Sequence, residues 1–163
     1  MRSAVDKKSV MLGILFSVVI FTSMVYSHCQ IPCGIYGASA RFDMIAENIT
    51  TIEKSMKMIT ELSKQDKPDM NQIVRWVQNK EKHADDISHI ITYYFMAQRV
   101  KPALKTASQE YDEYVKKLTL LHKMLVYSMK AKQTTDLANV EKLKGLSEEF
   151  HSVYFGKPDQ KNH

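Results

Sequence analysis

The sequence has little of what marks several large classes of protein. Only 5 of its 163 residues are glycine, and none belongs to a Gly-rich loop of the kind that binds phosphate groups. No segment alternates apolar and polar residues as a half-buried β-strand does, and no segment is repeated. The net charge of +5 is not concentrated in a Lys/Arg block with interleaved aromatic residues. The sequence therefore predicts neither a β-sheet nor a nucleic acid partner.

The first 27 residues have the layout of a secretory signal peptide. Three basic residues precede an apolar run over residues 11–21. Val25 and Ser27 supply acceptable small residues three places and one place before a cut that would leave His28 as the new amino terminus. We therefore expect residues 1–27 to be removed and the protein to be exported, to the periplasm or the medium, with cytoplasmic processing of the leader as the alternative.

An uncleaved membrane anchor is the other interpretation of this leader. Residues 10–26 form a 17-residue span, at the lower edge of the roughly 17 to 25 residues needed to cross a bilayer. Cleavage would leave 136 residues, enough for one domain, with no membrane-bound part. It would also remove three basic residues and one acidic residue, which lowers the net charge from +5 to +3.

Four amphipathic helices are predicted downstream of Tyr36, because apolar residues recur there at steps of three and four. We expect them over residues 39–64, 69–100 and 102–129 and, after a polar link at 130–135 and a cap at Asp136, up to Gly156. The third has the most regular pattern, with apolar positions at Leu104, Ala107, Tyr111, Tyr114, Leu118, Leu121, Leu125 and Met129. The fold class is thus all-α, an antiparallel up-and-down four-helix bundle over residues 37–157, followed by a polar tail at 158–163.

The two cysteines of the chain, Cys29 and Cys33, both lie within six residues of the predicted new amino terminus. A disulfide is one interpretation, although it would close only a tiny loop and stabilise the fold little. A tetrahedral zinc site would normally need four side-chain ligands, whereas this segment offers two thiolates and one imidazole. If the amino group of His28 is free, that nitrogen and the Cys29 amide nitrogen can join both thiolates in a planar donor set suited to Ni(II) or Cu(II).

The segment His-Cys-x-x-Pro-Cys-Gly-x-Tyr at residues 28–36, behind a removable leader, resembles the nickel hook of the nickel superoxide dismutases. We call residues 28–36 the hook segment. The resemblance implies a four-helix bundle assembled as a homohexamer, one nickel ion per subunit, and dismutation of superoxide through Ni(II) and Ni(III). Further local likeness to the family lies at Ala40-Arg41 and Lys101-Pro102.

The resemblance also implies a role for each hook residue. His28 would bind nickel through its amine and, in the oxidised state, its imidazole. Cys29 would bind through its amide nitrogen and thiolate, and Cys33 through its thiolate. Tyr36 would stand at the mouth of the site and restrict access to small anions. Two further residues would shape the hook, Pro32 through its turn and Gly34 through close backbone approach.

Several positions depart from the family pattern. Gln30 stands where the family usually has an acidic residue, and Asp43 stands in for the glutamate that orients the imidazole. The arginine partner of that carboxylate has two candidates by position, Arg75 and His83, and the tyrosine at the end of the second helix is Tyr93 or Tyr94.

The remaining histidines do not predict a second metal site. The Glu-x-x-His pattern of di-metal helical bundles occurs once, at Glu148 and His151. We expect His83, His89, His122 and His151 to be solvated or at the boundary of the core. The alternative function is a secreted or membrane-anchored helical interaction protein in which Cys29 and Cys33 form an inert disulfide.

Overall fold

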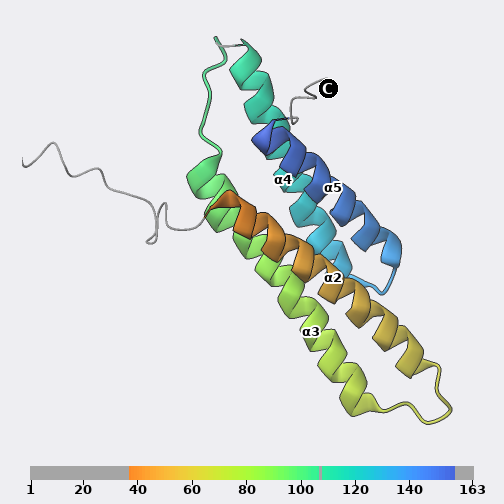
Figure 1. Ribbon diagram of the computed structural model, residues 1–163. Coiled ribbons are helices and arrows are strands. Elements are labelled where there is room, and N and C mark those ends of the chain that lie inside the picture. The colour runs from red at the N-terminus through yellow and green to blue at the C-terminus, as the bar shows by residue number, and fades with distance from the viewer. Residues whose placement is uncertain (1–36, 107, 157–163) are drawn as a thin grey trace, which may run out of the picture. The chain divides into compact units, whose positions relative to one another are not determined.

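The computed structural model describes residues 37–106 and 108–156, which fold into a bundle of helices (Figure 1). The four α-helices are α2 (Ala38–Ser63), α3 (Met70–His89), α4 (Ser108–Gln133) and α5 (Leu137–Phe155), and a π-helix, η1 (Ile90–Arg99), continues α3. These described residues contain no β-strand, so the all-α prediction is confirmed. The predicted signal peptide and hook segment lie outside the described residues.

The helices are arranged in chain order around one core. α2 packs against α3 and α5, and α4 packs against the same two neighbours. Successive helices run in opposite directions (Figure 1), as an up-and-down bundle requires. Within the described residues, no helix is both long and apolar enough to cross a membrane.

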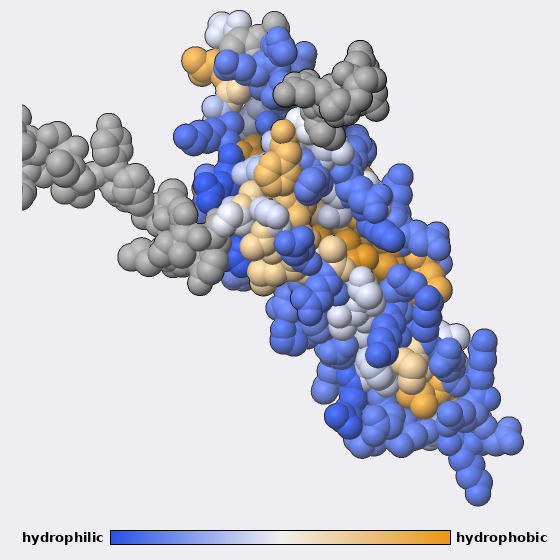
Figure 2. Space-filling view, in the orientation of Figure 1, coloured by the Kyte–Doolittle hydropathy of each residue, from blue (hydrophilic) through white to orange (hydrophobic). Residues whose placement is uncertain are grey.

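The predicted inward face of the first helix is confirmed. Its apolar residues at steps of three and four are Phe42, Ile45, Ile49, Ile52, Met56, Ile59 and Leu62. The first six are buried, and only Leu62, at the far end, is half-buried. Three phenylalanines from three helices meet in the core: the Phe95 ring centroid lies 5.0 Å from that of Phe42 and 4.9 Å from that of Phe150. On the face drawn in Figure 2, hydrophilic residues cover most of the surface and hydrophobic residues show only in patches between them.

Capping residues mark the beginnings of α3 and α5 and the end of α5. The Asp69 carboxylate accepts a hydrogen bond from Gln72 N at 3.1 Å, and the Asp136 carboxylate accepts one from Ala138 N at 3.0 Å. The predicted cap at Asp136 is therefore confirmed. Gly156 follows α5 with a φ of 79°, a conformation that favours glycine, and ends that helix.

The third helix begins later than predicted. The pattern predicts a helix from Pro102, but α4 begins at Ser108. Val100 is buried in an extended conformation, and a residue that precedes proline, here Lys101, disfavours the helical region. Leu104, predicted to face the core, is 78 % exposed, so no burial stabilises a helical turn there.

The prediction of which α4 residues face the core is wrong in part. Leu121 is buried as predicted, but Met129 is half exposed, and the buried positions near the end of the helix are Ser128 and Ala131. The buried face of α4 is thus rotated relative to the face predicted from its large apolar residues. α4 also continues to Gln133, through part of the predicted polar link at 130–135.

The second helix is not a single α-helix as predicted. At Ile90 it widens into η1, which ends with a hydrogen bond from Val100 N to Phe95 O at 2.8 Å. The wider turn places residues that are five apart in the sequence on the same side of the helix. It buries Ile90, Ile91, Tyr94 and Phe95 and places the Arg99 guanidinium over the Tyr94 ring.

Candidate functional site

The predicted nickel ligands precede the described residues. His28, Cys29, Pro32, Cys33, Gly34 and Tyr36 all lie before Gly37, where the description begins, so their roles stay predictions. Between residues 37 and 156, leaving out 107, no group of three or more His, Cys, Asp or Glu side chains could hold a metal ion. The described bundle therefore offers no site that competes with the hook segment for a metal.

Asp43, the predicted substitute for the orienting carboxylate, is an exposed residue on α2. Within the described residues it makes no hydrogen bond or ion pair. Its helix contains no acidic residue in the first turn, where Gly37 precedes the helix without a capping side chain. The positive end of the helix dipole is therefore not offset by a first-turn carboxylate. The role of Asp43 beside His28 stays a prediction.

The two candidates for its basic partner, Arg75 and His83, lie in different places on α3. Arg75 is exposed and lines a cavity of about 440 Å³ with Trp76. His83 is half-buried and lines a second cavity of about 320 Å³, together with Arg41 and His89. The structure thus assigns them to separate surfaces, and only His83 shares a cavity with residues of the first turns of α2.

His83 is held by the buried residue Asn48. Its Nδ1 lies 2.5 Å from Asn48 Oδ1, and Asn48 is only 7 % exposed. Because an amide oxygen can only accept, the proton of this hydrogen bond is on His83 Nδ1. In the neutral ring this leaves Nε2 as the acceptor, so Asn48 determines which tautomer the ring adopts.

The structure separates Tyr93 from Tyr94. Tyr93 is 48 % exposed and stacks on His89 with ring centroids 4.3 Å apart. Tyr94 is buried, and two guanidinium groups lie against its ring: Arg41 at 5.3 Å and Arg99 at 4.9 Å from the ring centroid. Tyr94 is therefore the tyrosine that contacts the beginning of α2.

Tyr154 on α5 extends this cluster into the core. Its ring centroid lies 5.5 Å from that of Phe95. Burial raises the pKa of the Tyr154 hydroxyl above 10.0, with a further upward contribution from Tyr94, while Arg99 acts in the opposite direction. Residues from α2, η1 and α5 thus meet around Tyr94. Sequence reasoning missed this cluster because Arg99 and Tyr94 are five residues apart, a spacing that brings side chains together in a π-helix but not in an α-helix.

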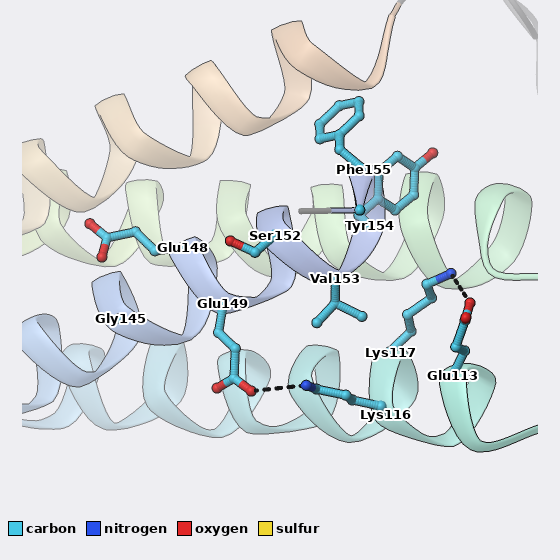
Figure 3. A pocket seen from close by; sticks show the side chains of 11 residues that line it. Glu113, Lys116, Lys117, Gly145, Glu148, Glu149, Ser152, Val153, Tyr154 and Phe155 are labelled. Carbon is cyan, nitrogen blue, oxygen red and sulfur yellow. Dashed lines mark ion pairs between the residues drawn. The ribbon is translucent and has the colours of Figure 1, made fainter. Parts of the chain in front are cut away.

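The largest of these cavities lies elsewhere, on α4 and α5 (Figure 3). It has a volume of about 740 Å³ and is lined by charged and small residues together with the aromatic residues Tyr154 and Phe155. Four of its five charged residues form two pairs: Lys116 lies 3.7 Å from Glu149, and Lys117 lies 3.6 Å from Glu113. The cavity contains no histidine or cysteine, so we assign it no part in metal chemistry.

The other histidines behave as predicted. His89, His122 and His151 are exposed, and His83 is half-buried at the edge of the core. The His151 ring packs edge-on against Phe42 with centroids 4.8 Å apart, and the single Glu148/His151 pair is part of no metal-binding group.

Comparison with known protein families places this chain. The family model described as nickel-containing superoxide dismutase matches residues 23–157. This range includes the hook segment and all of the described helices. No curated protein and no solved structure matches the chain.

Proposed function

Because the chain belongs to the family of nickel-containing superoxide dismutases, we propose that the hook segment, residues 28–36, is where it binds nickel. The family match over residues 23–157 is the observation that carries this proposal. It makes the protein a nickel-dependent superoxide dismutase, an oxidoreductase whose substrate is superoxide. Two superoxide anions and two protons yield one dioxygen and one hydrogen peroxide.

The chemistry of the donor set fits nickel. The amine of His28, the amide nitrogen and thiolate of Cys29, and the thiolate of Cys33 form a nitrogen and sulfur set of the kind that suits planar Ni(II). These are the only two cysteines in the sequence, and the described helices offer no group of three ligands that could take their place. When bound, nickel would supply a one-electron couple between Ni(II) and Ni(III).

The other hook residues would shape access to this donor set. Pro32 favours a turn that returns Cys33 toward Cys29, and Gly34 permits close approach of the backbone. Tyr36 would limit entry to small anions through its ring and order the substrate through its hydroxyl. The imidazole of His28 would add a further nitrogen ligand, oriented by a carboxylate for which Asp43 is our candidate.

The proposal requires a free amino group at His28. Removal of the leader after Ser27 would create it, and the signal-peptide layout of residues 1–27 supports export as the occasion for this cleavage. By resemblance to the family, we propose that the processed subunits assemble as a homohexamer.

Mass spectrometry of the protein purified from its own cells tests the site. We expect a chain that begins at His28 and carries about one nickel ion. A retained leader would contradict the proposal. So would a chain that begins at His28 with a Cys29–Cys33 disulfide and no metal after anaerobic nickel loading, a result that would favour the helical interaction protein instead.

A single alanine inserted before His28 tests the amine ligand. The insertion moves the free amine one residue away from Cys29, so we expect loss of both nickel binding and dismutase activity, with an unchanged helical circular dichroism spectrum. The control is an alanine inserted after Gly156, where no ligand is displaced. Retained nickel in the first variant would show that the amine of His28 is not a ligand.

A further inference from the structure

The cavity that contains Trp76 lies between α2 and α3, which pack against each other. Its volume is about 440 Å³, within the range of roughly 300–1,000 Å³ that is typical of sites for small molecules. We call it the Trp76 cavity. Its lining comes from two residues of α2 and four of α3: Thr51, Lys54, Gln72, Arg75, Trp76 and Asn79. Each of these side chains carries a hydrogen-bond donor, so the cavity suits a ligand that accepts hydrogen bonds.

Two of these donors are cations, and the lining, as the structure describes it, contains no carboxylate. Lys54 and Arg75 are exposed, and neither forms an ion pair with another described residue. Lys54 Nζ lies over the Trp76 ring at 6.0 Å from its centroid, which is the outer limit, about 6 Å, of a cation–π contact. Both cations are therefore available to an anion.

Neighbouring carboxylates do not cancel these charges. Three acidic residues lie within three positions of a lining residue in the sequence, and each interacts with a group of its own. Glu53 is paired with Lys57 at 2.5 Å, and the Asp69 carboxylate caps the beginning of α3. Glu81 acts on the buried Lys80, where it opposes the lowering of the pKa of that lysine by burial. The Trp76 cavity thus keeps a positive balance.

Two of the six lining side chains already donate within the protein. Thr51 Oγ1 donates to Glu47 O at 2.9 Å, and Asn79 Nδ2 donates to Ser55 Oγ at 3.0 Å, a bond that joins α3 to α2. The other four side chains donate no hydrogen bond to a described residue: Lys54, Gln72, Arg75 and Trp76. These four therefore remain as donors to a ligand.

We propose that the Trp76 cavity binds a small organic anion, a phosphate or carboxylate group carried on a flat ring. The anionic oxygens accept hydrogen bonds from Arg75, whose planar guanidinium matches both groups, and Lys54 adds its charge. The ring lies against the indole of Trp76, which is half-buried between the two helices. This site is separate from the hook segment, and its existence does not depend on the proposed function.

The first test uses the fluorescence of Trp76, which is the single tryptophan of the chain and so reports on this cavity alone. Phenyl phosphate is titrated at constant ionic strength into the protein purified from its own cells. We expect a saturable change in emission, weaker binding of inorganic phosphate, which lacks the ring, and no saturable change with benzyl alcohol, which lacks the charge. No saturation with phenyl phosphate, or equal affinity for either of the other two compounds, would overturn the proposal.

The second test removes the cations one at a time. Arg75→Gln should raise the dissociation constant of phenyl phosphate about tenfold, the loss expected for one hydrogen bond to a charged group. Lys54→Gln should raise it by a smaller factor, and Arg75→Lys should recover only part of the affinity because it lacks the planar fork. The control is Lys123→Gln, which removes an exposed charge from α4, a helix that contributes no residue to the cavity. Unchanged affinity in Arg75→Gln, or an equal loss in Lys123→Gln, would refute a specific site.

The third test addresses the wall of the cavity. Trp76→Ala loses the fluorescent reporter, so binding is measured by isothermal titration calorimetry, and circular dichroism verifies that the helices are retained. This variant should bind phenyl phosphate and inorganic phosphate with similar affinity, because the surface that contacts the ring is gone. A preference for phenyl phosphate that survives in Trp76→Ala would show that the ring does not lie against Trp76.

Discussion

Replacing Lys80 by methionine should lower the free energy of unfolding, because this lysine donates hydrogen bonds to backbone carbonyl groups at the end of a neighbouring helix. Lys80 is on α3 and is only 4 % exposed. Its Nζ donates hydrogen bonds to Lys132 O at 2.6 Å and to Thr134 O at 3.1 Å, at the carboxyl end of α4. Methionine has a similar length and apolar stem but no donor, so it preserves the packing and removes the two bonds.

The size of the effect follows from three contributions. Hydrogen bonds that involve a charged group contribute about 1.5–3 kcal/mol each. Thr134 is exposed and Lys132 is half-buried, so water can replace part of what is lost. Relief from burying an ammonium group further offsets the loss. We expect a net decrease of about 2 kcal/mol at pH 7, measured by urea denaturation followed by circular dichroism at 222 nm.

The pH dependence gives a second signature of the same lysine. Burial lowers the pKa of Lys80 from its ordinary 10.5, more than nearby Glu81 raises it. Between the lowered pKa and 10.5 the unfolded chain holds more protons than the folded one, so the contribution of Lys80 to stability rises with pH in that window. The difference between the parent protein and Lys80→Met should therefore be larger at pH 10 than at pH 7. Contributions from other groups, including Tyr154, cancel in this difference.

The matched control is Lys82→Met, on the same helix two residues away. Lys82 is exposed and forms a surface pair with Asp86 one turn further along, so its replacement should change the free energy of unfolding by less than about 0.5 kcal/mol. Equal stability of Lys80→Met and Lys82→Met would refute the reasoning, since it would mean that the two buried bonds contribute nothing.

Three further predictions address the hook, the core and a helix end. Cys29→Ser and Cys33→Ser should each abolish nickel binding, measured by metal analysis, while the helical circular dichroism signal stays unchanged; nickel retained in either variant would exclude that thiolate as a ligand. Phe150→Ala should lower the free energy of unfolding by about 3–5 kcal/mol, because Phe150 is fully buried against Phe42 and Phe95. The half-exposed Phe155 is its control, and an equal loss in Phe155→Ala would contradict the packing argument. Asp136→Ala should cost about 1 kcal/mol by removing the cap of α5, and Asp136→Asn should recover most of it.

Much of the bundle could be predicted from the sequence, because amphipathic periodicity is a local property. The spacing of the apolar residues in α2 and α5 predicted which faces of these helices are buried. Asp136 predicted where α5 begins, because a helix cap depends only on residues within one turn. The prediction of the hook segment was equally local, because its predicted donors are neighbours in the chain and its resemblance to a nickel site does not depend on the fold. The family match agrees with the enzyme that this segment predicted.

Only the tertiary structure decided the features that depend on distant neighbours. Helical spacing of large residues could not reveal that Ser128 and Ala131 face the core while Met129 does not, because small residues become buried wherever another helix comes close. The widening of the second helix at Ile90, the reach of Lys80 to the end of α4, and the meeting of Arg41 with Arg99 across Tyr94 each join segments that lie apart in the sequence or depend on a change of helical period. The sequence by itself determined the four helical segments and predicted the donors of the hook segment. Packing between helices determined which of their polar side chains were brought together.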